Sequence, residues 1–436
     1  MPSPATAPLP GSGRGRPLLA DTHGPAATGP DMSCRAREGA AARPVGVTCA
    51  PLTSRSLRLL TCREPWIGRV ARAELVSVAA RPRIPDAVIA IPARDESARI
   101  ARCLDACLDS ITESGLMVDV LVLVNGSRDD TIERVARWSR RRARVVTLVD
   151  VDFHPGAAHA GGARSLALSL AAAGVPADTP LLTTDADAAP AIDWVRRNLA
   201  HLLGGARLVC GAIRLDEREA ARLPEPLTDV CDVTDRYQRA TRELEQLLDP
   251  DPWNRWPHHG ESGGASLALT RATLDAIGGV PFTPCGEDRA LAARLRGRGE
   301  CVRYADDVSV RVSCRLHGRA HGGMADTLRL RLFTLDPPCD AEYREAHRVE
   351  LDARLAAVVR RLWSRRSGRE RLLLSHGMSD GAAARLAGVD EVADVLQDCR
   401  AVGSPSRLRV GELRRELPRL LARLERARER TPTCPA

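Results

Sequence analysis

Two carboxylates follow an apolar run in the segment Leu181-Leu182-Thr183-Thr184-Asp185-Ala186-Asp187. In extended backbone, residues i and i+2 face the same side, so Asp185 and Asp187 can point their oxygens at one place beyond a strand end. Carboxylate oxygens suit a hard divalent cation, and such a cation commonly carries substrate phosphates. The pair therefore predicts a metal and phosphate site, with capping of a helix N-terminus as the structural alternative.

The spacing alone does not identify this site, because the chain has two further Asp-x-Asp triplets, Asp150/Asp152 and Asp249/Asp251. The order of the surrounding elements is more informative. Apolar runs that read as strands alternate with segments of helical periodicity, which favours a parallel sheet with helices on both faces. The expected strands span 86–92, 118–124, 145–149 and 181–184, and the expected helices span 97–114, 129–140 and 160–173.

Polar clusters stand at the ends of three of these strands. They are Arg94-Asp95-Glu96, Asn125-Gly126-Ser127 and Asp185-Ala186-Asp187. In open parallel sheets, ligands bind beyond the carboxyl ends of the strands. The sequence thus predicts one ligand site built from all three clusters.

The composition limits the classes of partner. The 436 residues are 44% apolar, which is enough for a sizeable core, and all 64 basic residues are arginine in a chain of net charge +8. This balance favours anionic partners such as nucleotide phosphates. No basic block with interleaved aromatics is present, so we expect no nucleic-acid groove.

Cysteine usage and hydropathy bear on the compartment. The 13 cysteines include no C-x-x-C pair, which is typical of small buried side chains in a reducing cytoplasm rather than of a zinc site. No apolar run approaches the roughly 20 residues that span a bilayer. We therefore expect a cytoplasmic protein without a transmembrane segment, and peripheral membrane contact stays open.

Five motifs in order resemble those of the family-2 glycosyltransferases, which bind nucleotide sugars with the GT-A fold. The resemblance covers roughly residues 86–325. Two motifs depart from the family pattern, with Asp95 in place of Asn and Asn125 in place of Asp. The motifs are Ile91–Glu96, Asn125–Thr131, Gly156–Leu168, Thr184–Asp187 and Gly286–Leu291.

The resemblance implies an α/β, Rossmann-like, mostly parallel sheet with helices on both faces and a helical C-terminal appendage. It places a glycosyltransferase domain at 83–335, with a nucleotide-sugar half at 86–190 and an acceptor half at 191–335. Residues 1–82, rich in Pro, Gly, Ala and Arg, are expected to form a disordered extension. Residues 340–436 are expected to be helical.

The resemblance also assigns the donor site. Asp187 would be the direct ligand of Mn²⁺ or Mg²⁺, while Asp185 would lie near the ribose or reach the metal through water. Arg164 would pair with the diphosphate. A late histidine, His317 or His321, is a candidate for completing the metal shell, and Arg315 and Arg319 are candidates for a phosphate or loop role. The remaining expected nucleotide-sugar contacts are Pro92, Ala93, Asp95, Glu96, Asn125, Ser127 and Asp129.

On the acceptor side, the resemblance makes Asp288 the general base and Glu287 its support. Ser262, Gly263 and Gly264 would form the acceptor floor. The structural alternative is simple helix capping, since carboxylates suit a helix N-terminus on dipole grounds. The acceptor itself is left open among small molecules, lipids and glycans.

Three alternatives to an inverting, metal-dependent glycosyltransferase remain open on the sequence. One is a retaining transferase of the glucosyl-phosphoglycerate synthase type, which a late histidine would favour. Another is a nucleotidyltransferase of similar fold, although no glycine-rich triphosphate loop follows Ile91. The third is an inactive sugar-nucleotide-binding module, which the departures at Asp95 and Asn125 keep open.

Overall fold

The structure is a computed structural model, and its description covers most of the chain after residue 51. The described residues are 52–62, 65–78, 84–318, 322–340, 342–363, 367–375, 378–389, 392, 395–396 and 407–430. Residues 1–51, which belong to the segment expected to be disordered, lie outside the described residues. The candidates Arg319 and His321 lie outside them as well.

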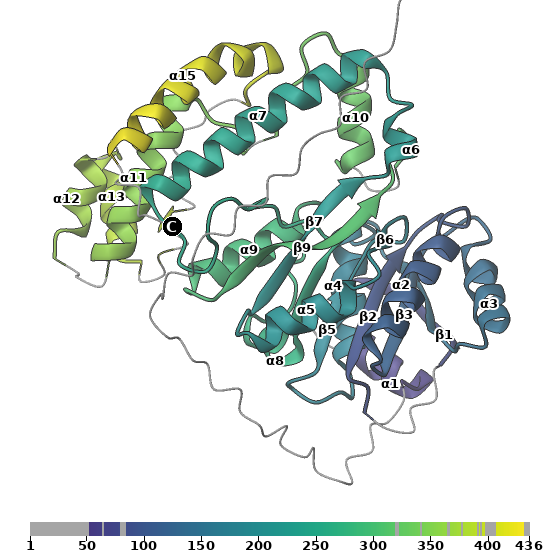
Figure 1. Ribbon diagram of the computed structural model, residues 1–436. Coiled ribbons are helices and arrows are strands. Elements are labelled where there is room, and N and C mark those ends of the chain that lie inside the picture. Colours follow the sequence, from purple (N-terminus) through teal and green to yellow (C-terminus); the bar gives the residue numbers. More distant parts are fainter. Residues whose placement is uncertain are drawn as a thin grey trace, which may run out of the picture. The chain divides into compact units, whose positions relative to one another are not determined.

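A nine-stranded sheet in the order β1-β4-β3-β2-β5-β8-β7-β9-β6 organises the protein (Figure 1). The four strands from β4 to β5 run parallel to one another, as the alternating pattern predicts. They are β2 (Ala87–Ala93), β3 (Val118–Asn125), β4 (Thr147–Phe153) and β5 (Pro180–Thr183). The expected α/β class is confirmed, and the ends of these strands meet at one edge of the sheet.

Two apolar layers cover this parallel region because successive side chains of a strand point to opposite faces. Val88 and Ala90 of β2 pack on one face with α4 (Ala160–Ala172). Ile89 and Ile91 pack on the other face. The helices of that second face are α2 (Ile100–Ser114), α3 (Thr131–Arg142) and α5 (Trp194–Leu203).

The strands after residue 188 extend the sheet with a mixed arrangement. β8 pairs antiparallel with both β5 and β7, whereas β7 and β9 are parallel. The strands are β6 (Ala189–Pro190), β7 (Leu208–Leu215), β8 (Leu267–Thr270) and β9 (Val302–Val312), with the helices α6 (Glu217–Ala220), α8 (Arg271–Ala276) and α9 (Glu287–Gly297). α9 begins where the Glu-Asp motif predicts a helix start.

The folded part begins earlier than residue 83, which corrects the expected boundary. α1 (Ser54–Thr61) buries Leu57, and β1 (Val70–Ser77) pairs antiparallel with β4. Trp66, between them, is 2% exposed and belongs to the core under the sheet. β1 is an edge strand with every residue at least partly exposed, so its polar composition hides it from a search for apolar periodicity.

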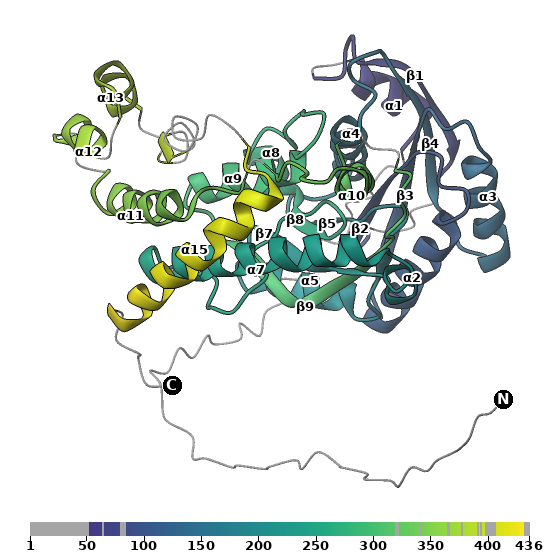
Figure 2. The same cartoon turned by 90° about the horizontal axis from the view of Figure 1, so that it is seen from above.

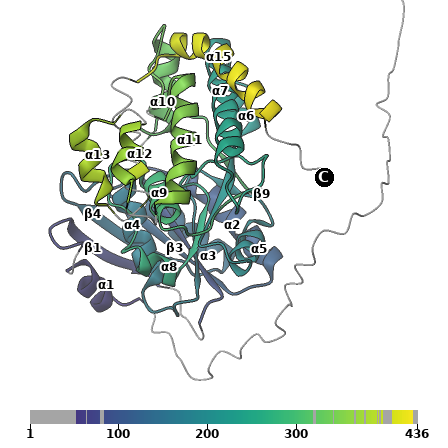
Figure 3. The same ribbon diagram turned by 90° about the vertical axis from the view of Figure 1, so that its left-hand side faces the viewer.

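The described part of the region after residue 340 is helical as expected, and both its first and its last helix share a core with an earlier helix. α11 (Ala346–Leu362) and α15 (Val410–Arg430) pack against α7 (Glu225–Leu248), as Figures 2 and 3 show from two sides. α12 (Arg369–Ser375) and α13 (Asp380–Ala387) lie between them in the sequence, and α10 (Met324–Phe333) precedes the region. None of the described helices has the length and apolarity to cross a membrane.

Candidate active site

Hydrogen bonds join the two loops that follow β2 and β3. The backbone N–H of Asp95 donates to Ser127 Oγ at 2.9 Å, and Asp95 Oδ1 accepts from the N–H of Arg128 at 2.6 Å. Asp95 has a φ of +50°, a left-handed conformation that aspartate tolerates better than most residues. The structure therefore brings the first two predicted clusters together, with Asp95 and Ser127 holding the loops to each other.

Asp129 and Glu96 add a second set of contacts between the same loops. Asp129 Oδ2 accepts from the N–H of Ser97 at 3.0 Å, and the N–H of Glu96 donates to Thr131 Oγ1 at 2.9 Å. Burial alone would raise the pKa of Asp129, but hydrogen bonds from Thr131 and Ser97 outweigh it and lower that pKa. Asp129 thus stays ionised as a loop clamp, which leaves its expected donor contact a prediction.

Arg164 of α4 is a buried hub beneath the carboxylate pair. Its side chain is 5% exposed, and its Nη2 lies 2.6 Å from Asp185 Oδ1 while its Nε lies 3.0 Å from Glu287 Oε1. Nη1 donates to Thr183 Oγ1 at 3.0 Å and to the carbonyl of Gly264 at 2.7 Å. Four of the five N–H groups are therefore used within the protein, and the diphosphate contact expected for Arg164 stays a prediction.

Two glycines make room for this hub. A Cβ on Gly264 would lie 2.3 Å from Arg164 Nη2, and a Cβ on Gly161 would lie 2.1 Å from the carbonyl oxygen of Thr283. Real Cβ atoms do not approach other heavy atoms so closely. Glycine at 264 accordingly lets the turn pack on Arg164, and glycine at 161 lets α4 pack on the segment around Thr283.

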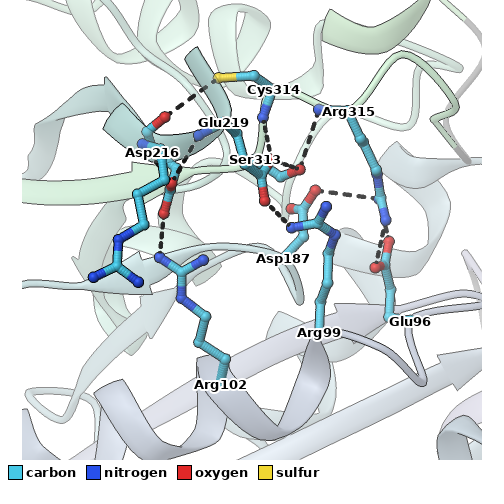
Figure 4. Close-up of polar contacts among 10 residues, drawn as sticks. Glu96, Arg99, Arg102, Asp187, Asp216, Glu219, Ser313, Cys314 and Arg315 are labelled. Atoms are coloured by element: carbon cyan, nitrogen blue, oxygen red, sulfur yellow. Dashed lines mark hydrogen bonds and ion pairs between the residues drawn. The ribbon is translucent and has the colours of Figure 1, made fainter. Parts of the chain in front are cut away.

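Asp187 carries an arginine of its own, from the segment that follows β9 (Figure 4). Arg315 Nη2 lies 3.2 Å from Asp187 Oδ2, and the same guanidinium forms a two-pronged pair with Glu96, with Nη1 at 2.7 Å from Oε2. Burial, reinforced by the negative charge of Asp185, raises the pKa of Asp187 to about 6 despite Arg315. Burial therefore costs the ionised carboxylate of Asp187 more than its ion pair with Arg315 returns.

A further ion-pair network fixes the segment that carries Arg315. Glu219 Oε2 accepts from Ser313 Oγ at 2.8 Å and from the N–H of Cys314 at 2.9 Å, while Arg99 pairs with Glu219 Oε1 at 2.6 Å. Figure 4 shows this network beside Arg315. Sequence reasoning missed Arg99 and Glu219, since they lie 120 positions apart in stretches without a recognisable motif.

The Glu-Asp motif stands at the N-terminus of α9. Asp288 Oδ2 accepts from the N–H of Gly264 at 2.7 Å, and Oδ1 accepts from the N–H of Arg289 at 2.7 Å. Glu287 is buried and pairs with Arg164 rather than facing solvent. Arg164 therefore links Glu287 to Asp185, and the acceptor role expected for Glu287 and Asp288 stays a prediction.

The remaining predicted residues occupy the same edge with fewer recorded contacts. Pro92 and Ala93 end β2, and Asn125, 4% exposed, ends β3. His317 is exposed in the loop after β9, two residues beyond Arg315. Its expected metal role stays a prediction.

The two other Asp-x-Asp triplets have structural partners. Asp150 and Asp152 pair with Arg72 of the edge strand β1, at 2.5 Å and 2.7 Å. Asp249 pairs with Arg360 of α11. Asp150 and Asp152 lie inside β4 on the side of the sheet where β1 pairs, and Asp249 follows α7, so neither triplet shares the position of Asp185/Asp187 after β5.

The carboxylate oxygens near Asp187 fit a hard divalent cation. The protein would supply only part of the coordination shell of that cation. Within the described part of the chain, no three or more His, Cys, Asp or Glu side chains are grouped as a metal site. Mg²⁺ commonly binds through one or two carboxylates, substrate phosphates and water. Asp187, with Asp185 beside it, provides such carboxylates, and burial together with the charge of Asp185 raises the pKa of Asp187 to about 6.

Comparison with known proteins identifies the family of the segment that builds the donor side. Residues 88–258 match the model of glycosyl transferase family 2. No curated protein matches the sequence.

Solved structures of similar arrangement are remote. The mannosyltransferase PcManGT from Pyrobaculum calidifontis, in complex with GDP-Man and Mn²⁺, shares 18% identity over 82% of this chain and 90% of that chain, with a TM-score of 0.41. TarS 1-349 of S. aureus with UDP shares 13% over 78% and 91%, with a TM-score of 0.37. Glucosyl-3-phosphoglycerate synthase from Mycobacterium tuberculosis, with Mg²⁺ and UDP, shares 21% over 57% and 78%, with a TM-score of 0.32.

The family assignment consequently rests on the sequence match, which spans the two joined loops, Arg164 and the carboxylate pair. Residues 88–258 belong to glycosyl transferase family 2, and the protein is a glycosyltransferase.

Proposed function

We propose that this protein transfers a sugar from a nucleoside diphosphate sugar to an acceptor hydroxyl, with a divalent cation at Asp187 and with inversion of the anomeric centre. The observation that carries the proposal is that the buried guanidinium of Arg164 joins Asp185, of the carboxylate pair, to Glu287, of the Glu-Asp motif. Donor and acceptor chemistry need to lie this close for a single displacement.

On the donor side, the joined loops after β2 and β3 offer a rigid platform for the base and ribose. Their mutual hydrogen bonds fix Asp95 and Ser127 before any ligand arrives. A bound Mn²⁺ or Mg²⁺ would act as a Lewis acid toward the leaving diphosphate. The protein would contribute by holding Asp187 beyond the end of β5, beside Asp185, where the cation would bind.

On the acceptor side, Asp288 is the proposed general base. Its two oxygens each accept one backbone N–H, from Gly264 and Arg289, and a carboxylate oxygen has a further lone pair for an acceptor hydroxyl. These bonds fix the orientation of the carboxylate, and a base needs to lie within hydrogen-bond reach of the proton that it removes. Glu287 then acts through Arg164 as a positioning residue.

The test of the donor site is Asp187→Ala, with Asp249→Ala as a matched control from an Asp-x-Asp triplet that pairs with Arg360 of α11. We expect Asp187→Ala to abolish both transfer and Mn²⁺-dependent thermal stabilisation by nucleoside diphosphate sugars, since the proposed direct ligand of the cation is lost. Asp249→Ala should retain both. Full metal-dependent turnover in Asp187→Ala would refute the site.

The test of the acceptor site is Asp288→Asn. The amide keeps the shape of the carboxylate but cannot take a proton, so donor binding should persist while transfer stops. Loss of donor binding would instead remove Asp288 from the role of base. NMR of the product anomer then separates inversion from retention, and a panel of nucleoside diphosphate sugars with Mn²⁺ identifies the donor.

A further inference from the structure

Arg315 occupies the position beside Asp187 that a cation ligated by this carboxylate would approach. Its guanidinium bridges the carboxylates of Glu96 and Asp187, whose side chains are 7% and 19% exposed. Burial would lower the pKa of Arg315, but the hydrogen bond to Glu96 and the charge of Asp187 raise it, so the residue is a permanent cation. The positive charge at Asp187 is thus supplied from within the chain.

The backbone that carries Arg315 is fixed by contacts that do not involve Asp187. Ser313 and Cys314 are hydrogen-bonded to Glu219, which pairs with Arg99, the residue before α2. The backbone N–H of Arg315 donates to Ser313 Oγ at 3.2 Å. A change at this site therefore proceeds by rotation of the long Arg315 side chain about a fixed anchor.

A divalent cation on Asp187 conflicts with this arrangement. Arg315 Nη2 lies 3.2 Å from Asp187 Oδ2, so a cation bound to that oxygen would stand against a guanidinium in a partly buried place. Like charges at such separations repel each other strongly where water is largely excluded. The second arginine of the site, Arg164, is already engaged with Asp185 and Glu287 and cannot be exchanged in the same way.

We propose that Arg315 is an internal counter-cation, that is, a side chain whose positive charge pairs with Asp187 when no metal is bound. The Arg315 side chain has to move away from Asp187 before a divalent cation binds there. The proposal rests on the metal role of Asp187 in the proposed function. It adds that the protein suppresses binding of the cation alone. The anionic diphosphate of the donor, arriving with the cation, offers the displaced guanidinium a new partner.

The experiment is Mn²⁺ binding to the full chain at pH 7.5 without nucleotide, followed by the EPR signal of free Mn²⁺. Arg315→Ala should bind Mn²⁺ about tenfold or more tightly than the wild type, because a charge-assisted hydrogen bond no longer competes. Arg315→Lys keeps the positive charge but loses the two-pronged geometry of the guanidinium, so its Mn²⁺ affinity should lie between those of the wild type and Arg315→Ala. Arg102→Ala is the matched control, since it breaks a 2.5 Å pair with Asp216 in the neighbouring network without contacting Asp187.

Unchanged or weaker Mn²⁺ binding in a folded Arg315→Ala protein would overturn the proposal, and Arg315→Lys provides the same comparison if the alanine variant fails to fold. A gain that persists in Asp187→Ala/Arg315→Ala would overturn it too, because the cation would then bind elsewhere.

Addition of UDP or GDP separates this proposal from the proposed function. If the wild type binds Mn²⁺ with nucleotide and Arg315→Ala binds Mn²⁺ with the same affinity as the wild type both with and without nucleotide, the counter-cation role of Arg315 is refuted while the proposed function stands. Absence of Mn²⁺ binding in both proteins with nucleotide refutes the metal site itself. A nucleotide-induced gain in Mn²⁺ affinity that is larger in wild type than in Arg315→Ala supports the proposal.

Discussion

Replacing Asp187 by asparagine should stabilise the unliganded protein while it destroys the cation site. Burial and the charge of Asp185 raise the pKa of Asp187 to about 6, so the ionised carboxylate is held at a cost in folding free energy. Asparagine has the same shape, accepts a hydrogen bond from Arg315 and carries no charge. Stability and cation binding therefore oppose each other at this position.

The size and sign of the effect follow from the pKa. A group whose pKa is raised in the folded protein takes up its proton more readily there, so its contribution to stability falls as pH rises through the interval between the two pKa values. For a rise from 3.8 to about 6, the cost is about 3 kcal/mol at pH 7.5 and roughly half that at pH 5. Below about pH 4 the cost disappears, since Asp187 is then protonated in both states.

The assay is urea unfolding of wild type and Asp187→Asn at pH 7.5 and pH 5, without divalent cations. The advantage of the variant should grow by about 1–1.5 kcal/mol between pH 5 and pH 7.5. Any constant difference between a neutral Asp and Asn cancels in this comparison. An advantage that is independent of pH, or that shrinks as pH rises, would refute the account of Asp187.

Three further outcomes are expected from the packing around Arg164. Arg164→Met should lower the free energy of unfolding, measured with urea, by about 3–5 kcal/mol, because it leaves the buried carboxylate of Glu287 without its partner. A loss below about 1 kcal/mol would contradict the structural role given to Arg164. Gly264→Ala places a methyl group 2.3 Å from Arg164 Nη2, so it should weaken Mn²⁺-dependent nucleotide binding in a titration, and unchanged binding would show that the turn yields freely. Gly161→Ala meets the fixed carbonyl of Thr283 at 2.1 Å and should cost about 1–3 kcal/mol in the same unfolding assay, whereas a neutral or stabilising result would mean that α4 shifts without penalty.

The donor side was accessible from the sequence because its signals are local. β-branched and aliphatic runs fix the parallel strands, and a polar residue directly after such a run must stand at the carboxyl edge of the sheet. This reasoning placed Asp95, Ser127 and the Asp185/Asp187 pair at one edge, where the structure finds them. It failed at β1, whose half-exposed residues carry little periodicity.

The pairing of charges was not accessible in the same way. Among 64 basic residues, all arginine, nothing local marks Arg164 as a buried hub or Arg315 as the partner of Glu96, which lies 219 positions away. The sequence expectation for Arg164 was a diphosphate contact, whereas the structure occupies four of its N–H groups with protein acceptors. Such partners are chosen by proximity after folding, since any arginine can pair with any carboxylate.

By itself, the sequence determined the class of fold, the edge of the sheet at which the candidate site lies and the carboxylates available there, because periodicity and strand-end position are properties of neighbouring residues. Only the tertiary structure decided which charge stands beside each carboxylate. Asp185 shares Arg164 with Glu287, and Asp187 shares Arg315 with Glu96. Electrostatic energy depends on distance in space and on burial, and the order of residues along the chain specifies neither.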